Sequence, residues 1–384
     1  MKRIYLFIYI CMWLTTASYA QEVKDSLTQM ADEAVVDSGR VAYKQPRWMR
    51  AKSVDSRLEK IHKKLNPIDT TYIEPQRFNF TVMLQNTNTY EVYRLNTSEG
   101  QSITFAPEPS IKIGPYFGWR WAFLGYTIDV RHLDLTHRDW TKTEYDVSLY
   151  SSMVGIDIYY RKTGNDYRIR RVTLGKGIDT EPMKNVSFGG LTSSIKGADI
   201  YYIFNYRKFS YPAAFSQSTV QRRSAGSPLV GVGYTEHSLA VDWEAFGDLV
   251  DKTLGQPVAE SVVDESLMFR TVKYRDISIS GGYAYNWVFA RNWLMAASLS
   301  LAMAYKHTSG DLKGDRFRLH DFTISNINVD GIGRFGLVWN NTRWYAGMNA
   351  ILHAYNYRKS RFYTNNMFGS LNVYFGLNFG RRKN

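Results

Sequence analysis

The 384-residue sequence contains one cysteine, Cys11, and no run of eighteen apolar residues occurs after residue 20. A single cysteine cannot form an internal disulfide or a cysteine metal site. An apolar run shorter than eighteen residues is too short for a membrane-spanning helix. These absences exclude a disulfide-stapled scaffold and a helical membrane protein.

The first twenty residues have the composition of a targeting segment. Two basic residues at positions 2 and 3 precede an apolar run at 4–14, and small residues follow at 17–20. This order predicts a secretory signal peptide at residues 1–20. Cys11 would be removed with it, and it lacks the preceding small residues of a lipoprotein cleavage box. We therefore expect an exported protein without a lipid anchor.

The charge balance is basic, with 48 Lys and Arg residues against 35 Asp and Glu residues and a formal net charge of +13. A net positive charge of this size can indicate that a protein binds nucleic acid or an anionic surface. No basic stripe interleaved with aromatic residues stands out, and export argues against DNA. We therefore expect no nucleic-acid partner. Outer-membrane lipid and lipopolysaccharide are the expected partners, with a polysaccharide or a protein as a further candidate at external loops.

Residues 21–70 are charged, poor in aromatic residues and without strand alternation. Four apolar residues recur at helical spacing and predict one short amphipathic helix: Val54, Leu58, Ile61 and Leu65. We interpret this stretch as an N-terminal periplasmic segment. A flexible leader without a role fits the same composition.

From residue 76 onward, apolar and polar residues alternate with the period of a β-strand. The stretch LNVYFGLNF at 371–379 places five apolar side chains on one face and Asn, Tyr and Gly on the other. At 293–305 the alternate residues form an aliphatic row with an aromatic residue at each end. Lipid-facing strands meet the two membrane interfaces in this way.

The faces opposite the apolar rows carry small and polar residues instead of the Lys and Glu that dominate a soluble surface. Five charged or ionisable residues on these faces are expected to point into a lumen: Asp157, Arg161, Arg334, Arg343 and His353. This composition suits the crowded interior of a small barrel.

Alternation and turn signals together predict about twelve strands. They span 76–86, 110–119, 120–130, 145–161, 166–174, 195–207, 227–240, 269–290, 291–306, 327–340, 342–358 and 366–379. Tight connections at 119–120, 163–165, 291–292 and 340–341 all follow an even-numbered strand, whereas most connections after odd-numbered strands are long. Short turns at one end and long loops at the other are typical of outer-membrane barrels.

The predicted fold is therefore an all-β, antiparallel, up-and-down transmembrane β-barrel at residues 71–384, whose last strand closes against the first. A secreted β-sandwich is the alternative.

The central sequence at 201–230 resembles a known family. FSYPAAFSQ at 209–217, followed by QRRSAGS at 221–227, is similar to the signature of the domain-of-unknown-function 4421 family, which consists of exported proteins of Gram-negative bacteria. DTTYIEP at 69–75 and the hairpin at 333–347 resemble its opening and closing parts. The resemblance covers about residues 66 to 380. It implies an outer-membrane-like barrel and brings no assigned activity.

The segment at 208–227 fills the one even-to-odd connection that is not short. Its good helix formers and small residues predict a short helix or tucked loop at the periplasmic mouth. Four basic residues there could bind an anionic group or pair with lumen carboxylates: Arg207, Lys208, Arg222 and Arg223. A structural plug that fills the barrel end is the favoured interpretation.

No constellation of residues predicts catalysis or a metal site. The sequence at 307–310 (HTSG) and the His-Asp pair at 320–321 share one expected loop, but nothing fixes a nucleophile beside a base. The acidic stretch at 242–265 lacks the spacing of calcium ligands and reads as a solvated loop, part of it helical. A calcium ion bridging lipopolysaccharide phosphates is the alternative there. We expect no cofactor.

Three classes of function fit these features. A structural or surface-binding barrel, with external loops that contact polysaccharide, lipid or a partner protein, is favoured because large inward tyrosines and arginines tend to fill small barrels. A small-solute pore is the first alternative. A barrel enzyme that acts on lipid is the second, and it lacks a convincing triad.

Overall fold

The computed structural model describes residues 67–97, 99–119, 122–125, 128–129, 143–162, 166–175, 177–255, 271–310, 327–358 and 362–381. The expected signal peptide and the expected helix at 54–65 lie outside these ranges. The chain divides into two units, 1–60 and 61–384, and every described residue belongs to the second. Within these ranges, no helix has the length and apolar character needed to cross a membrane.

Antiparallel strands make up almost the whole described fold, as the alternation predicts. Twelve strands follow one another through hydrogen bonds in one path. In path order they are β5 (Ala122–Gly125), β4 (Ser110–Trp119), β2 (Phe78–Thr97), β17 (Phe362–Arg381), β16 (Trp344–Arg358), β15 (Ile327–Asn340), β14 (Trp293–Gly310), β13 (Thr271–Ala290), β12 (Ala225–Val241), β10 (Leu191–Ile203), β8 (Val154–Lys162) and β7 (Thr143–Tyr150).

Five shorter strands lie at the margins. β3 (Ser102–Pro107), β6 (Ile128–Asp129) and β9 (Tyr167–Thr173) join the path and bring the sheet to 15 strands. β1 (Ile73–Pro75) and β11 (Thr219–Gln221) form a separate two-stranded sheet.

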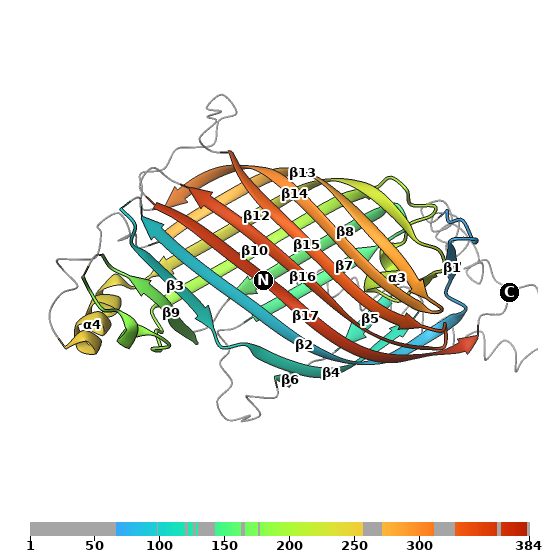
Figure 1. The fold of residues 1–384 in the computed structure, drawn as a ribbon, viewed down its shortest axis with the longest axis horizontal. Helices are drawn as coiled ribbons and strands as arrows, with labels where there is room; N and C mark the ends of the chain where they lie inside the picture. Colours follow the sequence, from blue (N-terminus) through green and yellow to red (C-terminus); the bar gives the residue numbers. More distant parts are fainter. Residues whose placement is uncertain are drawn as a thin grey trace, which may run out of the picture. The chain divides into compact units, whose positions relative to one another are not determined.

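The first and last long strands of the sheet pair with each other. β2 and β17 run antiparallel from the pair Phe362 and Thr97 to the pair Arg381 and Phe78. The path ends at β5 and β7, and no hydrogen bond between described residues joins these two edges. The sheet curls around an interior (Figure 1). Asp157 of β8 and Arg334 of β15 form an ion pair although four strands lie between β8 and β15 along the path.

The strand expected at 76–86 continues to Thr97 in β2, and the strand expected at 120–130 contains β5 and β6. Two other predicted strands change the path of the sheet. The strand expected at 145–161 is the hairpin β7–β8, whose turn at 151–153 is closed by a hydrogen bond from the Ser151 N–H to the Val154 carbonyl, 2.9 Å long. The strand expected at 166–174 is β9, which pairs with β3 and leaves the twelve-strand path. The two differences compensate, so the path keeps the predicted number of strands.

The two ends of the sheet differ in their connections. The turn end carries the tight turns at 151–153, 291–292 and 341–343, together with the start of β2 and the end of β17. The loop end carries the long connections at 163–190, 242–270 and 311–326. The connection at 163–165 was expected among the tight turns. Lys162, however, pairs with Thr143 and Ser194 at the loop end. Residues 163–165 therefore begin the long connection between β8 and β10.

The polarity of the fold is inverted relative to a soluble protein. The outward side chains of Ile279, Leu299 and Met303 are 67, 60 and 62% exposed. The inward side chains of Asp157 and Arg334 are 6 and 4% exposed. An apolar outer face around a polar interior is the arrangement of a membrane β-barrel.

Inward tyrosines fold over glycines on the neighbouring strand. A Cβ atom on Gly376 would lie 2.2 Å from the ring of Tyr345, its cross-strand partner, and Gly155 bears the same relation to Tyr201. A side chain larger than hydrogen at either glycine would push the ring out of place. The glycines therefore let large aromatic rings lie flat against the wall and fill the interior.

An apolar core lies at the loop end, with residues from β3, β9, the 3-10 helix η3 (Glu181–Met183) and α4 (Trp243–Leu254). The helix predicted in the acidic stretch is confirmed as α4. Asp242 caps it by accepting a hydrogen bond from the Ala245 N–H, and Gly255 ends it at a φ of 72°. Its buried residues Phe246 and Val250 join this core. Figure 1 shows α4, β3 and β9 gathered at one end of the sheet and α3 (Tyr211–Phe215) near the other.

Candidate functional site

The interior is crossed near its middle by a buried ion pair. Arg334 donates from Nη2 to Oδ2 of Asp157 at 2.5 Å, and Ser148 donates to Oδ1 of the same carboxylate at 2.6 Å. The Arg334 guanidinium also lies 5.0 Å from the centre of the Tyr201 ring. Two buried charges tolerate burial only when they are paired and hydrogen-bonded in this way. The pair therefore joins β7 and β8 to the opposite wall.

Arg161 and His353 lie in the interior beside an aromatic stack. The rings of His353 and Phe368 are 4.8 Å apart at an interplanar angle of 8°, and the rings of Phe368 and Tyr355 are 5.5 Å apart at 13°. The Arg161 guanidinium lies 5.1 Å from the Phe368 ring centre. Tyr355 is joined across the interior to Tyr159 by a 2.6 Å hydrogen bond between their hydroxyl groups.

Arg343 does not point into the interior. β16 begins at Trp344, so Arg343 belongs to the turn at 341–343, where Thr342 has a φ of 79° and the Arg343 side chain is exposed. The expectation of a lumen-facing Arg343 was wrong because the alternation was extended one residue past the start of the strand.

A buried polar network that sequence reasoning missed lies nearer the loop end. His237 contacts Ser193 through Nε2 at 3.3 Å, and its Nδ1 faces the Tyr274 hydroxyl and the Asn366 amide. His237 of β12 therefore links its own strand to β10, β13 and β17.

The segment that follows β10 enters the interior at the turn end. Ser210 caps α3 by accepting a hydrogen bond from the Ala213 N–H, and the Tyr211 hydroxyl is 2.6 Å from that of Ser298 on β14. Ala214 packs against a wall cluster that includes Leu294. The structure thus places the predicted short helix where the plug interpretation requires it.

The rest of the segment is held on several sides. Gln217 donates to the Tyr374 hydroxyl at 2.9 Å and accepts from the Asn340 amide at 3.1 Å. The Asn286 amide donates to the Ser210 carbonyl at 2.8 Å. These bonds fix the segment to β13, β15 and β17.

The four predicted basic residues lie at the turn end but do not form one site. Arg222 pairs with Glu74 and donates to the Asn292 side chain at 2.8 Å. Lys208 lies 5.1 Å from the centre of the Tyr72 ring. Arg207 is exposed, and its backbone carbonyl accepts a hydrogen bond from the Asp69 N–H.

Arg223 shares the ring of Tyr72 with Lys208, at 5.8 Å from its centre. Asp69 lies near both cations. Hydrogen bonds from Thr71 lower the pKa of the Asp69 carboxyl, and the charges of Lys208 and Arg223 lower it further. The basic cluster is therefore partly neutralised by Asp69 and Glu74.

The structure describes only parts of the remaining candidate sites. Residues 307–310 form the end of β14, and the pair at 320–321 lies outside the described residues, as does the acidic stretch beyond 255. Among the described residues, no three His, Cys, Asp or Glu side chains lie close enough to hold a metal ion.

Comparison with known proteins identifies one matching family, described as a domain of unknown function (DUF4421), over residues 67–379. No curated protein matches the sequence significantly. Among solved structures, the outer membrane protease OmpT from Escherichia coli is 6% identical, with 81% of this chain and 100% of that chain covered and a TM-score of 0.31.

Two further solved structures are similar at the same level. The translocator domain of the autotransporter NalP from Neisseria meningitidis is 9% identical, covering 86% of this chain and 96% of that one at a TM-score of 0.25. The Pseudomonas putida toluene transporter TodX is 9% identical, covering 79% and 91% at a TM-score of 0.20. Similarities at this level carry no information about activity.

Proposed function

This chain belongs to the domain-of-unknown-function 4421 family, and from that premise we propose that it spans the bacterial outer membrane as a sealed β-barrel whose loop end serves a structural or surface-binding role. The candidate partners at the loop end are lipopolysaccharide, a polysaccharide or a protein. A small-solute pore is the alternative, and a lipid-directed enzyme remains the weaker one.

The membrane placement is supported by the inverted polarity of the sheet. If the protein were surrounded by water, the exposed residues of β13 and β14 would form a broad apolar patch on its surface. Soluble monomers rarely carry such a patch. Exposed aromatic rings, among them Trp293, Phe379 and Tyr363, lie toward the ends of the apolar rows. Rings of this kind occupy the two interfaces of a bilayer.

Contacts that cross the interior support a structural or binding role over a pore. Opposite walls are joined by Asp157 and Arg334 and by Tyr159 and Tyr355 near the middle. α3 fills the turn end, and the apolar core that includes Phe246 fills the loop end. A path for hydrated solutes through the part of the interior that these residues line would have to break contacts at all three levels.

The described part of the loop end is suited to contact with a partner because α4 and η3 are folded against the core. α4 and η3 are anchored by the buried residues Phe246, Val250 and Met183. Their outer faces carry exposed charges, including Glu181 and Lys184, which pair at 2.9 Å, and Glu244 and Asp248. A surface that is ordered before binding loses less conformational entropy when it binds.

A conductance measurement tests the sealed interior. The full chain, refolded and inserted into planar bilayers, is expected to give no regular unitary current steps, because side chains and α3 block the interior. A porin refolded and inserted under the same conditions supplies the positive control. Uniform steps whose size follows the salt concentration would overturn the proposal and establish the pore.

A further inference from the structure

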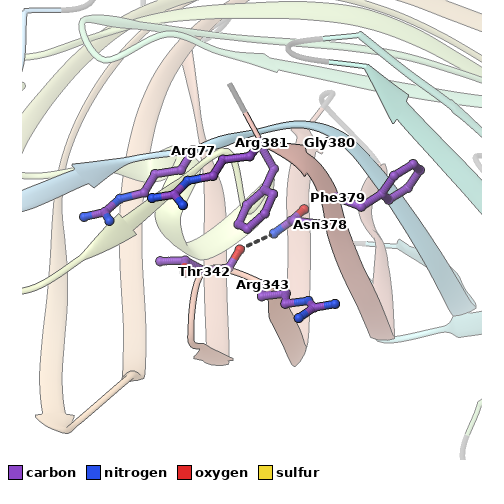
Figure 2. A pocket seen from close by; sticks show the side chains of 8 residues that line it. Arg77, Thr342, Arg343, Asn378, Phe379, Gly380 and Arg381 are labelled. Carbon is purple, nitrogen blue, oxygen red and sulfur yellow. Dashed lines mark hydrogen bonds between the residues drawn. The ribbon is translucent and has the colours of Figure 1, made fainter. Parts of the chain in front are cut away.

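A shallow pocket of about 370 Å³ opens at the turn end, where β2, β17 and the turn between β15 and β16 meet (Figure 2). Its lining includes three arginines, Arg77, Arg343 and Arg381, and no acidic residue. Phe78 and Phe379 are its aromatic lining residues. We call it the seam pocket, because it lies where the first and last long strands pair.

The positive charge of the seam pocket is only partly balanced. Arg77 forms an ion pair with Glu74 at 2.8 Å, and Glu74 is shared with Arg222 of the neighbouring segment. Arg343 and Arg381 are exposed and make no ion pair with a described residue. In Figure 2, Arg77 and Arg381 lie side by side, and Arg343 extends on the opposite side of the pocket. Two guanidinium groups without an ionic partner in the described part of the chain therefore flank it.

The backbone beneath these arginines is held in one geometry. Asn378 donates from its side chain to the Thr342 carbonyl at 2.8 Å and from its backbone to the Arg343 carbonyl at 2.7 Å. The Asn341 side chain accepts from the N–H groups of Arg343 and Trp344 at 3.1 and 2.8 Å. The turn at 341–343 is thus fastened to β17, while the exposed Arg343 side chain extends from it.

Exposed aromatic rings place the seam pocket relative to the membrane. Phe379 stacks on Phe80 of β2 with ring centres 5.5 Å apart, and Trp344 stacks on Phe375 at the same distance. Such rings mark the level where hydrocarbon gives way to headgroups. Arg343 comes one residue before Trp344, and Arg381 comes two residues after Phe379, so both lie on the turn-end side of these rings. In the proposed membrane placement, this is the level of the lipid phosphates.

The chemistry of the lining selects the ligand. A guanidinium group is weakly hydrated and presents paired N–H donors that match two oxygens of a phosphate. An exposed phenylalanine beside it offers apolar surface that suits an acyl chain. A ligand with a phosphate and an attached hydrocarbon chain satisfies both features, whereas a sugar or a metal ion satisfies neither.

We propose that the seam pocket binds the phosphate group of a glycerophospholipid from the leaflet at the turn end, with Arg343 and Arg381 as donors and an acyl chain along Phe379 and Phe80. This inference rests on the membrane placement proposed above. Inorganic phosphate shares the phosphate chemistry but lacks the chain. The net positive charge of the pocket favours phospholipids with an anionic headgroup over zwitterionic ones.

Lipid retention tests the seam pocket. The full chain is refolded in non-ionic detergent, phosphatidylglycerol is titrated in, and the bound lipid is measured by native mass spectrometry. In the variant Arg343→Gln/Arg381→Gln, the affinity is expected to fall by about tenfold or more, because hydrogen bonds to charged groups are lost. Arg343→Lys/Arg381→Lys should recover part of the loss, since the charge remains without the bidentate geometry.

The matched control is Arg207→Gln/Arg291→Gln, which removes two exposed arginines of the same end that lie outside the pocket. It should retain lipid as the unmodified chain does. Equal loss in both variants would overturn the pocket and indicate a general charge effect. Equal retention in both would overturn it as well.

Competition with inorganic phosphate separates the two sources of the phosphate group. Phosphate at the same concentration as the lipid should displace little of it, because it cannot use the apolar surface of Phe379. Complete displacement would show a free-anion site and overturn the lipid source. A chain that stays folded and monodisperse without detergent would instead count against the membrane placement, so failure of the pocket and failure of the placement are distinguishable.

Discussion

Arg334→Met is expected to lower the free energy of unfolding by about 3–5 kcal/mol, because it leaves the Asp157 carboxylate buried without its cation. The carboxylate keeps the hydrogen bond from Ser148, and the contact between the guanidinium and the Tyr201 ring is lost. Urea titration of the refolded chain in lipid vesicles, followed by tryptophan fluorescence, measures the change.

Two further variants isolate the reason for the loss. Arg334→Met/Asp157→Leu removes both charges and should regain most of the stability, since an apolar pair of similar volume can replace a buried ion pair. Arg291→Met removes an exposed arginine at the turn end and should change little. If the double variant is as unstable as the single one, the cost comes from lost packing and the buried ion pair is not its cause.

Val373→Arg is expected to destabilise the barrel by about 2–4 kcal/mol, whereas Phe379→Arg on the same face of β17 should cost about 0–1 kcal/mol beyond the loss of its ring contact with Phe80. Val373 is 47% exposed and lies well inside the strand, between the outer aromatic residues Tyr363 and Phe379. A charge there would sit in hydrocarbon, whereas one at Phe379 would reach the headgroups.

The heat-modifiable folded band on unboiled gels, and urea titration in vesicles, measure the two variants side by side. Equal effects at both positions would show that depth does not matter along this strand. The outer face of β17 would then border water, as in the secreted sandwich.

Strand alternation predicts most of the wall because each outward row is long and unbroken. The strands expected at 269–290 and 291–306 match β13 and β14 closely, and β17 pairs with β2 as the closing strand requires. The hairpin β7–β8 was missed because its turn, Ser151 to Met153, contains neither glycine nor proline. The alternation on its two sides therefore reads as one strand.

The interior is less accessible to sequence reasoning, because contacts between opposite walls depend on how the sheet curls. The alternation along each strand indicates that the side chains of Asp157 and Arg334 both lie on the inner face of the sheet. The sequence does not indicate that β8 lies opposite β15. The same limit applies to His237 and Asn366, which are 129 residues apart. The predicted basic cluster shows that residues close in sequence can also lie in different environments. Arg222 pairs with Glu74, whereas Lys208 lies over the ring of Tyr72.

Spin-label accessibility along β17 is the most direct measurement of the inverted barrel. In a chain with Cys11 replaced by serine, single cysteines at positions 371 to 375 carry a nitroxide, and collisions with oxygen and with a water-soluble nickel chelate are measured in vesicles. The labels at 371, 373 and 375 should meet oxygen but not the chelate. The labels at 372 and 374, in the packed interior, should meet little of either. Strong chelate contact at 371, 373 and 375 would contradict the membrane barrel.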